Sequence, residues 1–381
     1  MLHWTDSHAL LFALAFALSL GMGLLIVLTS RWHLRYSADA HEGVQKVHSK
    51  VTARVGGLGI MLSLYLVWLL GMDIPSLDLD FTDLPHLLGL FLLAAIPAFS
   101  FGLMEDLSGR IGILSRLLAT MVSGLMAWWV TGDVLHNVDT WGLNALLAST
   151  PVALVFTVLA VATVANGFNL VDGFNGLSSG IATLAFFVFS LMAQGVGDLD
   201  LHLLCLVFAG ASFGFFVINW PWGQLFLGDG GAYLLGFLLG WVAVMLKVRH
   251  DAISTYAIAM VLMHPLTELL FTVYRRTARK QHPGMPDRLH LHSLVKRRFV
   301  NRAFVGRSQI FRNSATGLLI ILLGALGQFL ACLTLFSVVG SVIAFVAMVV
   351  LYLLFYARIV YFRWVFPWQL LRLKLRPSKQ S

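Results

Sequence analysis

Carboxylates gather at the ends of apolar runs in this sequence. Glu105 and Asp106 follow one run, Asp172 follows a second, and Asp229 precedes a third. An unpaired carboxylate at the edge of an apolar segment is costly, because burial removes its water. Four such groups brought together would repel one another unless a cation neutralised them. Carboxylate oxygens, in a chain with only two cysteines, favour Mg²⁺, with Mn²⁺ as the alternative.

Further residues suited to a phosphate ligand lie in the same polar stretches. The stretches are QKVHSKVTARVGGLG (45–59), FGLMEDLSGR (101–110), NGFNLVDGFNGLSSG (166–180), INWPWGQLFLGDGGA (218–232) and HPGMPDRLHLHSLVKRR (282–298). Their cationic and imidazole side chains suit phosphates, and the set is Lys46, His48, Arg54, Arg288, His290 and His292. Their glycines allow the backbone to approach a ligand closely, and GDGG predicts a helix N-terminus, which favours anions. Together these features indicate phosphoryl chemistry on a lipid substrate.

The elements that must position these groups are membrane helices. The chain has 381 residues, of which 59% are hydrophobic and only 12% charged, and its mean hydropathy is +0.84. A soluble domain of this length carries about twice that share of charge. We therefore expect an all-α, polytopic membrane protein with a single domain over residues 1–381. Eleven spans are predicted, at about 9–29, 55–72, 86–103, 111–130, 147–165, 176–195, 201–219, 230–247, 252–274, 315–337 and 341–361.

The basic residues predict the orientation of these spans. All but two of the 26 Lys and Arg residues fall in one set of alternate loops and in the C-terminal tail, and the exceptions are Lys247 and Arg249. Cytoplasmic loops carry the excess of Lys and Arg, so the N-terminus is expected outside and the C-terminus inside, with 275–314 as a basic cytoplasmic loop. All five polar stretches then share the cytoplasmic face. The net charge of +8 suits anionic lipids or an anionic substrate and requires no nucleic acid.

Simpler readings compete with a shared site. GDGG and DGFNG are commonly turns or helix caps, Asp106 could pair with Arg110 one turn on, and VGGLG could serve helix packing. The run 296–298 could be an orientation signal, and His264 with Glu268 is predicted to be a buried pair. The placement of five polar stretches on one face favours a composite site over these readings.

The motifs resemble a known family, the polyprenyl-phosphate N-acetylhexosamine-1-phosphate transferases. NGFNLVDGFNGLSSG is similar to N-x-x-N-x-x-D-G-x-D-G-L-x-x-G, and NWPWGQLFLGDGGA is similar to N-x-P-P-A-x-x-F-x-G-D-x-G-S. HSKVTARVGG resembles H-x-x-x-T-P-R-x-G-G. PDRLHLHSL resembles P-D-R-x-H-x-H-H-L, the form of the sugar-1-phosphate branch rather than of the peptidoglycan branch. The resemblance runs in order from about residue 20 to residue 300.

The resemblance implies an activity. An N-acetylhexosamine 1-phosphate, in the first place GlcNAc-1-phosphate, would pass from a UDP-sugar to undecaprenyl phosphate with Mg²⁺, releasing UMP. This step starts lipid-linked surface glycans such as O-antigen lipopolysaccharide and belongs to cell wall biogenesis. The resemblance places the protein among the lipids of the bacterial inner (cytoplasmic) membrane as a multi-pass protein, and leaves a homodimer open.

The resemblance also implies roles for individual residues. Asp229 would bind the metal and Asp172 would lie beside the metal and the diphosphate. Phe226 would stack on uracil, and the polar side chains near the nucleoside would be Asn166, Asn169, Asn175 and Asn219. Lys46 and Arg54 would lie near the phosphates. His290 and His292 would face the sugar-phosphate side.

Two departures from the family pattern affect these roles. The family's adjacent aspartates are Glu105 and Asp106 here, so a nucleophilic role for the first acidic position is open to question. Asn175 replaces an aspartate that is associated with the nucleotide pocket. We favour direct attack by the lipid phosphate, which is already an anion, over a covalent carboxyl-phosphate intermediate.

The rival function is transport. Charged residues within a membrane also mark ion and substrate paths. A transporter would place polar or broken helices near the middle of the bilayer, whereas the polar stretches here lie at one face, apart from His264 and Glu268. A scaffold without activity would leave the carboxylates unexplained.

Overall fold

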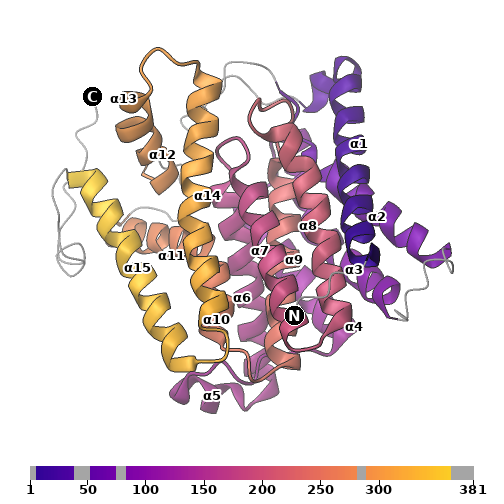
Figure 1. Cartoon of the computed structure of the whole chain (residues 1–381), viewed down its shortest axis with the longest axis vertical. Coiled ribbons are helices and arrows are strands. Elements are labelled where there is room, and N and C mark those ends of the chain that lie inside the picture. Colours follow the sequence, from indigo (N-terminus) through magenta and orange to yellow (C-terminus); the bar gives the residue numbers. More distant parts are fainter. Residues whose placement is uncertain (1–5, 38–51, 74–82, 281–288, 362–381) are drawn as a thin grey trace.

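The computed structural model of the chain describes residues 6–37, 52–73, 83–280 and 289–361. These residues form helices joined by short loops (Figure 1). The first helices are α1 (Asp6–Ser37), α2 (Gly56–Asp73), α3 (Leu84–Ser108), α4 (Ile113–Thr131), α5 (Trp141–Leu147), α6 (Thr150–Val171), α7 (Leu177–Gly195) and α8 (Leu199–Asn219). They are followed by α9 (Gly228–Arg249), α10 (Thr255–Val261), α11 (Met263–Ala278), α12 (Leu291–Val295), the π-helical turn η1 (Lys296–Val300), α13 (Asn301–Ala303), α14 (Gln309–Leu333) and α15 (Val338–Tyr361).

Local signals explain where several of these helices begin and end. Prolines occupy the first turns of α3 and α6, where the missing N–H costs no hydrogen bond. Gly109 and Gly132 end α3 and α4 in the left-handed conformation, at φ 63° and 75°. The Asp198 side chain caps α8 by accepting from Leu201 N, and Ser308 caps α14 by accepting from Phe311 N. The polar residues between the apolar runs thus act as helix boundaries.

The predicted membrane spans are confirmed as helices. Among the described residues, nine helices are long and apolar enough to cross a membrane, or ten if the bent pair α10 and α11 is one span. The predicted span 55–72 is α2, whose apolar part (56–71) is shorter than these helices. The predicted span 252–274 is wrong as a single straight helix, because the chain turns by 85° between α10 and α11. Pro265 lies in the first turn of α11. Because proline has no backbone N–H, it could not donate the hydrogen bond that a helix continuing from α10 would need there.

Helix α9 lies at the centre of the bundle. Almost every residue from Gly228 to Lys247 is buried, and α2, α3, α6 and α7 pack around it (Figure 1). At 1.5 Å per residue, its 22 residues extend about 33 Å, which is about the thickness of a bilayer core. The two ends of α9 therefore lie at the two ends of the bundle.

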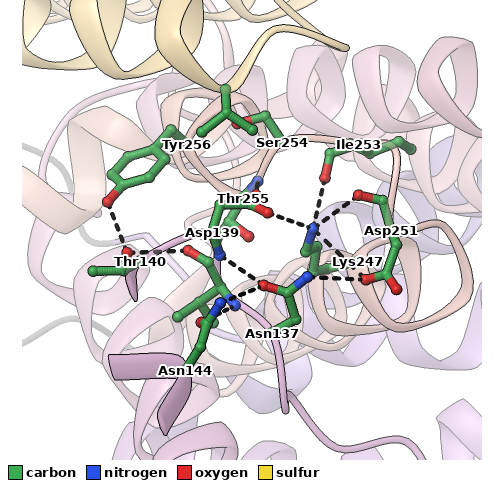
Figure 2. A network of polar contacts seen from close by, with 12 residues as sticks. Asn137, Asp139, Thr140, Asn144, Lys247, Asp251, Ile253, Ser254, Thr255 and Tyr256 are labelled. Carbon is green, nitrogen blue, oxygen red and sulfur yellow. Dashed lines mark hydrogen bonds and ion pairs between the residues drawn. The ribbon is translucent and has the colours of Figure 1, made fainter. Parts of the chain in front are cut away.

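A polar network surrounds the C-terminal end of α9 (Figure 2). Lys247 is only 2% exposed, and its Nζ donates to Asp139 Oδ1 at 3.0 Å and to the Asp251 and Ile253 carbonyls at 3.1 Å each. Asp139 Oδ2 accepts from Thr255 N at 2.7 Å, which ties the start of α10 to the loop before α5. A buried lysine is tolerated here because an anion and two carbonyls satisfy it.

Candidate active site

The N-terminal end of α9 carries the first cluster of predicted site residues. Asp106 of α3 accepts hydrogen bonds from Asp229 N at 2.8 Å and from Gly230 N at 2.9 Å. We predicted an anion at this helix N-terminus, and the anion found there is the protein's own Asp106 carboxylate. These bonds hold the start of α9 against the end of α3 and fix the backbone of Asp229.

Two arginines face the Asp229 carboxylate. Arg54 Nη2 lies 3.3 Å from Asp229 Oδ1 and 3.6 Å from Asp106 Oδ1. Arg116 Nη1, from the first turn of α4, forms an ion pair with Asp229 Oδ2. The side chains of Asp229 and Arg116 are 13% and 14% exposed, so water screens this pair poorly. Asp106 does not form the i+4 pair with Arg110 that its spacing allowed; its contacts in the described chain run to α9 and Arg54 instead.

Backbone pairing places Arg54 at this site. Phe226 N donates to Ala53 O, Gly56 N donates to Phe226 O, and Gly57 N donates to Leu227 O, each at 2.9 Å. The VTARVGG and FLGDGG segments are therefore joined side by side. Phe226 itself is half-buried, and its predicted stacking on uracil stays a prediction.

Close helix contacts bring these segments together. A Cβ added at Gly102 of α3 would lie 2.6 Å from Gly230 N and Cα, and one at Gly57 of α2 would lie 2.2 Å from Gly231 N. Only glycine permits backbones to approach this closely. The prediction that VGGLG serves helix packing is therefore correct for Gly57. This packing contact lies within the candidate site, so the packing and site interpretations of VGGLG are compatible.

Asp172 begins the loop that follows α6. It is half-buried and lies near both Arg54 and Asp229. Burial raises the pKa of Asp172 to about 7; the Arg54 guanidinium opposes this change, and the Asp229 carboxylate adds to it. The repulsion between carboxylates that the sequence implied is thus present between Asp172 and Asp229.

The predicted nucleoside asparagines join two of the motifs. Asn219 accepts from Gly176 N and donates to Leu225 O at 2.7 Å. Asn175 is 2% exposed and donates to Pro221 O at 3.0 Å and to Ser314 Oγ at 3.2 Å, while its Oδ1 is buried without a hydrogen-bond partner within the described chain. Both side chains therefore hold the DGFNG loop against the NWPWG loop, and their role toward a ligand stays a prediction.

Asn166 and Asn169 lie on the last turns of α6. Their side-chain oxygens lie 3.5 Å and 3.3 Å from the Tyr233 hydroxyl of α9. Asn166 also donates to Ala162 O at 2.8 Å. The α6 asparagines thus reach the same end of α9 as Asp229, one turn further along the helix.

The histidine motif lies beside the Asp172 loop. The His292 ring packs edge-on against Phe174 at a centroid distance of 5.4 Å and stacks on His290 at 5.4 Å. A Cβ added at Gly173 would lie 3.4 Å from His292 Nε2. Burial holds the pKa of His292 well below its ordinary value, and the neighbouring His290 lowers it further. His292 is therefore neutral near pH 7.

Lys296 of η1 brings a positive charge to the same loop. Its Nζ donates to Asn313 Oδ1 and lies 5.5 Å from the centre of the Phe174 ring. Burial and the nearby Arg312 lower the pKa of Lys296 to about 8. Lys296 is the first residue of the 296–298 run that the sequence favoured as an orientation signal, and it lies against the site.

Glu105 is half-buried at the end of α3. Its Oε2 accepts from Ile111 N at 2.7 Å and so fixes the loop between α3 and α4. The remaining predicted residues, Lys46, His48 and Arg288, lie outside the described part of the chain.

The donor atoms at this site are carboxylate oxygens, which suit a hard divalent cation. Within the described residues, no three His, Cys, Asp or Glu side chains are grouped closely enough to hold an ion as they stand. Both Asp229 oxygens are engaged by Arg54 and Arg116. The carboxylate oxygens suit a divalent cation by their chemistry, but the described residues do not form a preassembled ion site, because the two arginines hold the Asp229 oxygens that the cation would take.

Comparison with known proteins identifies the family. The model of glycosyl transferase family 4 matches residues 88–247. The chain is 30% identical over 254 residues to the undecaprenyl-phosphate alpha-N-acetylglucosaminyl 1-phosphate transferase of Thermotoga maritima, covering 67% of this chain and 71% of that one. The chain belongs to glycosyl transferase family 4.

Further relatives carry similar names. The decaprenyl-phosphate N-acetylglucosaminephosphotransferase of Mycolicibacterium smegmatis is 27% identical over an alignment of 284 residues that covers 68% of each chain. The undecaprenyl-phosphate alpha-N-acetylglucosaminyl 1-phosphate transferase of Salmonella typhi is 25% identical over 261 residues, covering 66% of this chain and 67% of that one. Membership of family 4 makes the protein a transferase and removes transport as the leading alternative.

The match to family 4 contains much of the site, including residues that sequence reasoning missed. Asp106, Asp172 and Asp229 lie inside it, as do Arg116 and Tyr233. In the sequence, Arg116 contributes only to the charge asymmetry that predicts orientation. Its position at the start of an apolar run, like that of the carboxylates, was the signal that could have found it.

Proposed function

We propose that this protein transfers GlcNAc-1-phosphate from UDP-GlcNAc to undecaprenyl phosphate and releases UMP. The observation that carries the proposal is the convergence of Asp106, Arg54 and Arg116 on Asp229 at one end of a buried helix, in a chain of family 4. The names of the relatives, which describe N-acetylglucosamine phosphate transferases with polyprenyl phosphate acceptors, support it. The product would start a lipid-linked surface glycan in the bacterial inner membrane.

The proposed reaction is a direct displacement at phosphorus. An oxygen of the lipid phosphate forms a bond to the β-phosphorus of the UDP-sugar, while the bond from that phosphorus to the bridging oxygen breaks. The electron pair leaves with UMP. Because the acceptor is already an anion, the protein must mainly position two phosphates and reduce their repulsion.

The side chains at the α9 end suit this task. Arg54 and Arg116 supply fixed positive charge, and Asp106 holds the α9 N-terminus on which Asp229 is placed. Asp229 and Asp172 would hold Mg²⁺, which when bound would spread the charge of the diphosphate. His292 is neutral and offers a hydrogen bond without adding charge.

The direct test is UMP release by purified protein in detergent with Mg²⁺, undecaprenyl phosphate and a panel of UDP-sugars. We expect release with UDP-GlcNAc that requires the lipid acceptor and stops with excess EDTA. UMP release with a different sugar alone would revise the donor, and no release with any sugar would refute the function.

Orientation is a further prediction. The charge asymmetry predicts that the site end of α9 faces the cytoplasm. In a Cys332→Ser background, a cysteine at Val305, which is 79% exposed, should react with an impermeant maleimide only after the cells are opened. A cysteine at Trp141, which is 95% exposed, should react in intact spheroplasts. The opposite pattern would place the site away from cytoplasmic UDP-sugars.

Glu105 distinguishes the direct route from the covalent one. Glu105→Gln keeps an oxygen for Ile111 N but loses the charge, so we expect UMP release to fall at least tenfold. Glu105→Asp, with its charge kept, should retain most activity, because charge neutralisation tolerates a shorter side chain better than nucleophilic attack does. Mass spectrometry should find no sugar-phosphate adduct on the protein without acceptor. An adduct that forms in the parent and not in Glu105→Gln would establish Glu105 as a nucleophile.

Gly102 tests whether the spacing between α3 and α9 matters. An alanine there must move Gly230 backbone atoms that would lie 2.6 Å from its Cβ, so Asp229 shifts and UMP release should fall at least tenfold. Gly21→Ala in α1 is the control, since its Cβ would meet nothing within 4 Å. Equal activity of the two variants would mean that the spacing is not critical.

A further inference from the structure

A buried carboxylate outside the cluster at the start of α9, Glu268, contacts the histidine motif. Glu268 of α11 is 0% exposed. Its Oε1 lies 3.0 Å from His290 Nδ1, and its two oxygens lie 3.3 Å and 3.2 Å from Leu291 N. Sequence reasoning paired Glu268 with His264, one turn away. That expectation is wrong: in the described chain both ring nitrogens of His264 are buried without a hydrogen-bond partner, and the partner of Glu268 is His290.

Helix α15 supplies a further hydrogen bond to Glu268. The Tyr352 hydroxyl, which is buried, donates to Glu268 Oε2. Arg275 of α11 donates to the Leu289 carbonyl at 3.1 Å and lies 3.0 Å from the Tyr356 hydroxyl. The segment just before His290 is thus tied to α11 and α15, and α15 lies outside the residues that the family model matches.

The hydrogen bond to Glu268 selects one form of His290. A carboxylate beside Nδ1 requires a proton on that nitrogen, which leaves Nε2 as the nitrogen that remains to act. His290 Nε2 is buried and has no hydrogen-bond partner among the described residues. The ring stacks on His292, which itself packs against Phe174 of the Asp172 loop. A continuous path of contacts therefore runs from Tyr352 and Glu268 through both histidines to the candidate active site.

We propose that Glu268, supported by Tyr352, is a positioning residue that holds His290 with Nδ1 protonated and Nε2 presented for the transfer reaction. This proposal rests on the proposed function and extends it, because it assigns α11 and α15 to the machinery of the same site. An orienting carboxylate fixes both the tautomer and the plane of the ring. Glu268 acts through His290 and touches no substrate in this scheme.

Kinetics of single and double variants test the proposal. Glu268→Gln keeps the size of the side chain but removes the carboxylate, and we expect kcat for UMP release to fall 10- to 100-fold, with KM for UDP-GlcNAc changed less than threefold. Tyr352→Phe should lower kcat by about threefold, an interaction of about 0.7 kcal/mol. In a His290→Asn background neither change should lower kcat further, because Glu268 then has no histidine to orient.

A matched control separates positioning from folding. Asp198 is a half-buried carboxylate that also accepts from a histidine, with Oδ2 2.9 Å from His250 Nε2, and it lies at the opposite end of the bundle. Asp198→Asn should lower the melting temperature and leave kcat unchanged. If Glu268→Gln behaves like Asp198→Asn, or if its effect on kcat persists in full without His290, then Glu268 is structural and the proposal is overturned.

A spectroscopic measurement tests the proposal without relying on turnover. Histidine ¹⁵N spectra are recorded for the parent protein and for His290→Asn, and the signals missing from the variant are assigned to His290. These signals should show that His290 is protonated at Nδ1. Those signals should shift in Glu268→Gln and stay unchanged in Asp198→Asn. If the parent protein releases no UMP yet this shift appears, the proposed function fails while the positioning stands. If turnover is normal and the His290 signals do not respond to Glu268, only the positioning fails.

Discussion

Asp229→Asn is expected to reduce UMP release by about three orders of magnitude, or several kcal/mol of transition-state stabilisation. Asp229 lies in the first turn of a buried helix, faces Arg54 and Arg116, and has its backbone N–H held by Asp106. An amide at this position keeps the shape but loses the charge that would hold Mg²⁺ and order the two guanidinium groups. Initial rates over a Mg²⁺ titration measure the effect, and a melting curve confirms that the variant is folded.

The matched control for this variant is Asp200→Asn. Asp200 occupies the first turn of α8, as Asp229 occupies the first turn of α9, but it lies at the opposite end of the bundle. Its substitution should change the rate less than twofold. If Asp229→Asn retained activity within tenfold of the parent protein, about 1.4 kcal/mol, Asp229 would not be a metal ligand.

Lys247→Met should cost about 3–5 kcal/mol of unfolding free energy, since it leaves a carboxylate in a poorly hydrated site without its cation. Lys247 is 2% exposed, and the Asp139 side chain that faces it is 10% exposed. Lys247 also donates to two carbonyls in the turn that leads to α10, so its loss frees that turn as well (Figure 2). Unfolding in mixed micelles with increasing SDS measures the change.

Arg249→Met provides the comparison for Lys247. Arg249 Nη1 lies 3.4 Å from Asp198 Oδ2, and its side chain is 35% exposed. Water competes for such a pair, so its loss should cost no more than about 1 kcal/mol. Equal costs for the two variants would mean that the Lys247 network is no more stabilising than a surface ion pair.

Much of the architecture could be predicted because membrane helices are encoded locally. A run of about 20 apolar residues must form a helix in a bilayer, where every backbone N–H and C=O needs a partner. The same constraint made polar residues at the ends of runs stand out, and Asp106 and Asp229 were found in this way. The span 252–274 was mispredicted because hydropathy reports apolar length, and the 85° turn between α10 and α11 leaves that length unchanged.

Contacts between distant segments decided the rest. The sequence by itself determined a polytopic helical membrane protein with its polar motifs gathered toward one face, since composition and periodicity follow from neighbouring residues. Only the tertiary structure placed Arg116 on Asp229, Asp106 on the α9 N-terminus, and Glu268 on His290 instead of His264. These pairings join residues 22 to 123 positions apart. The pairing of carboxylates with cations depends on the distances between packed helices. Glycines such as Gly57 and Gly102 set these distances, and no local sequence pattern reports them.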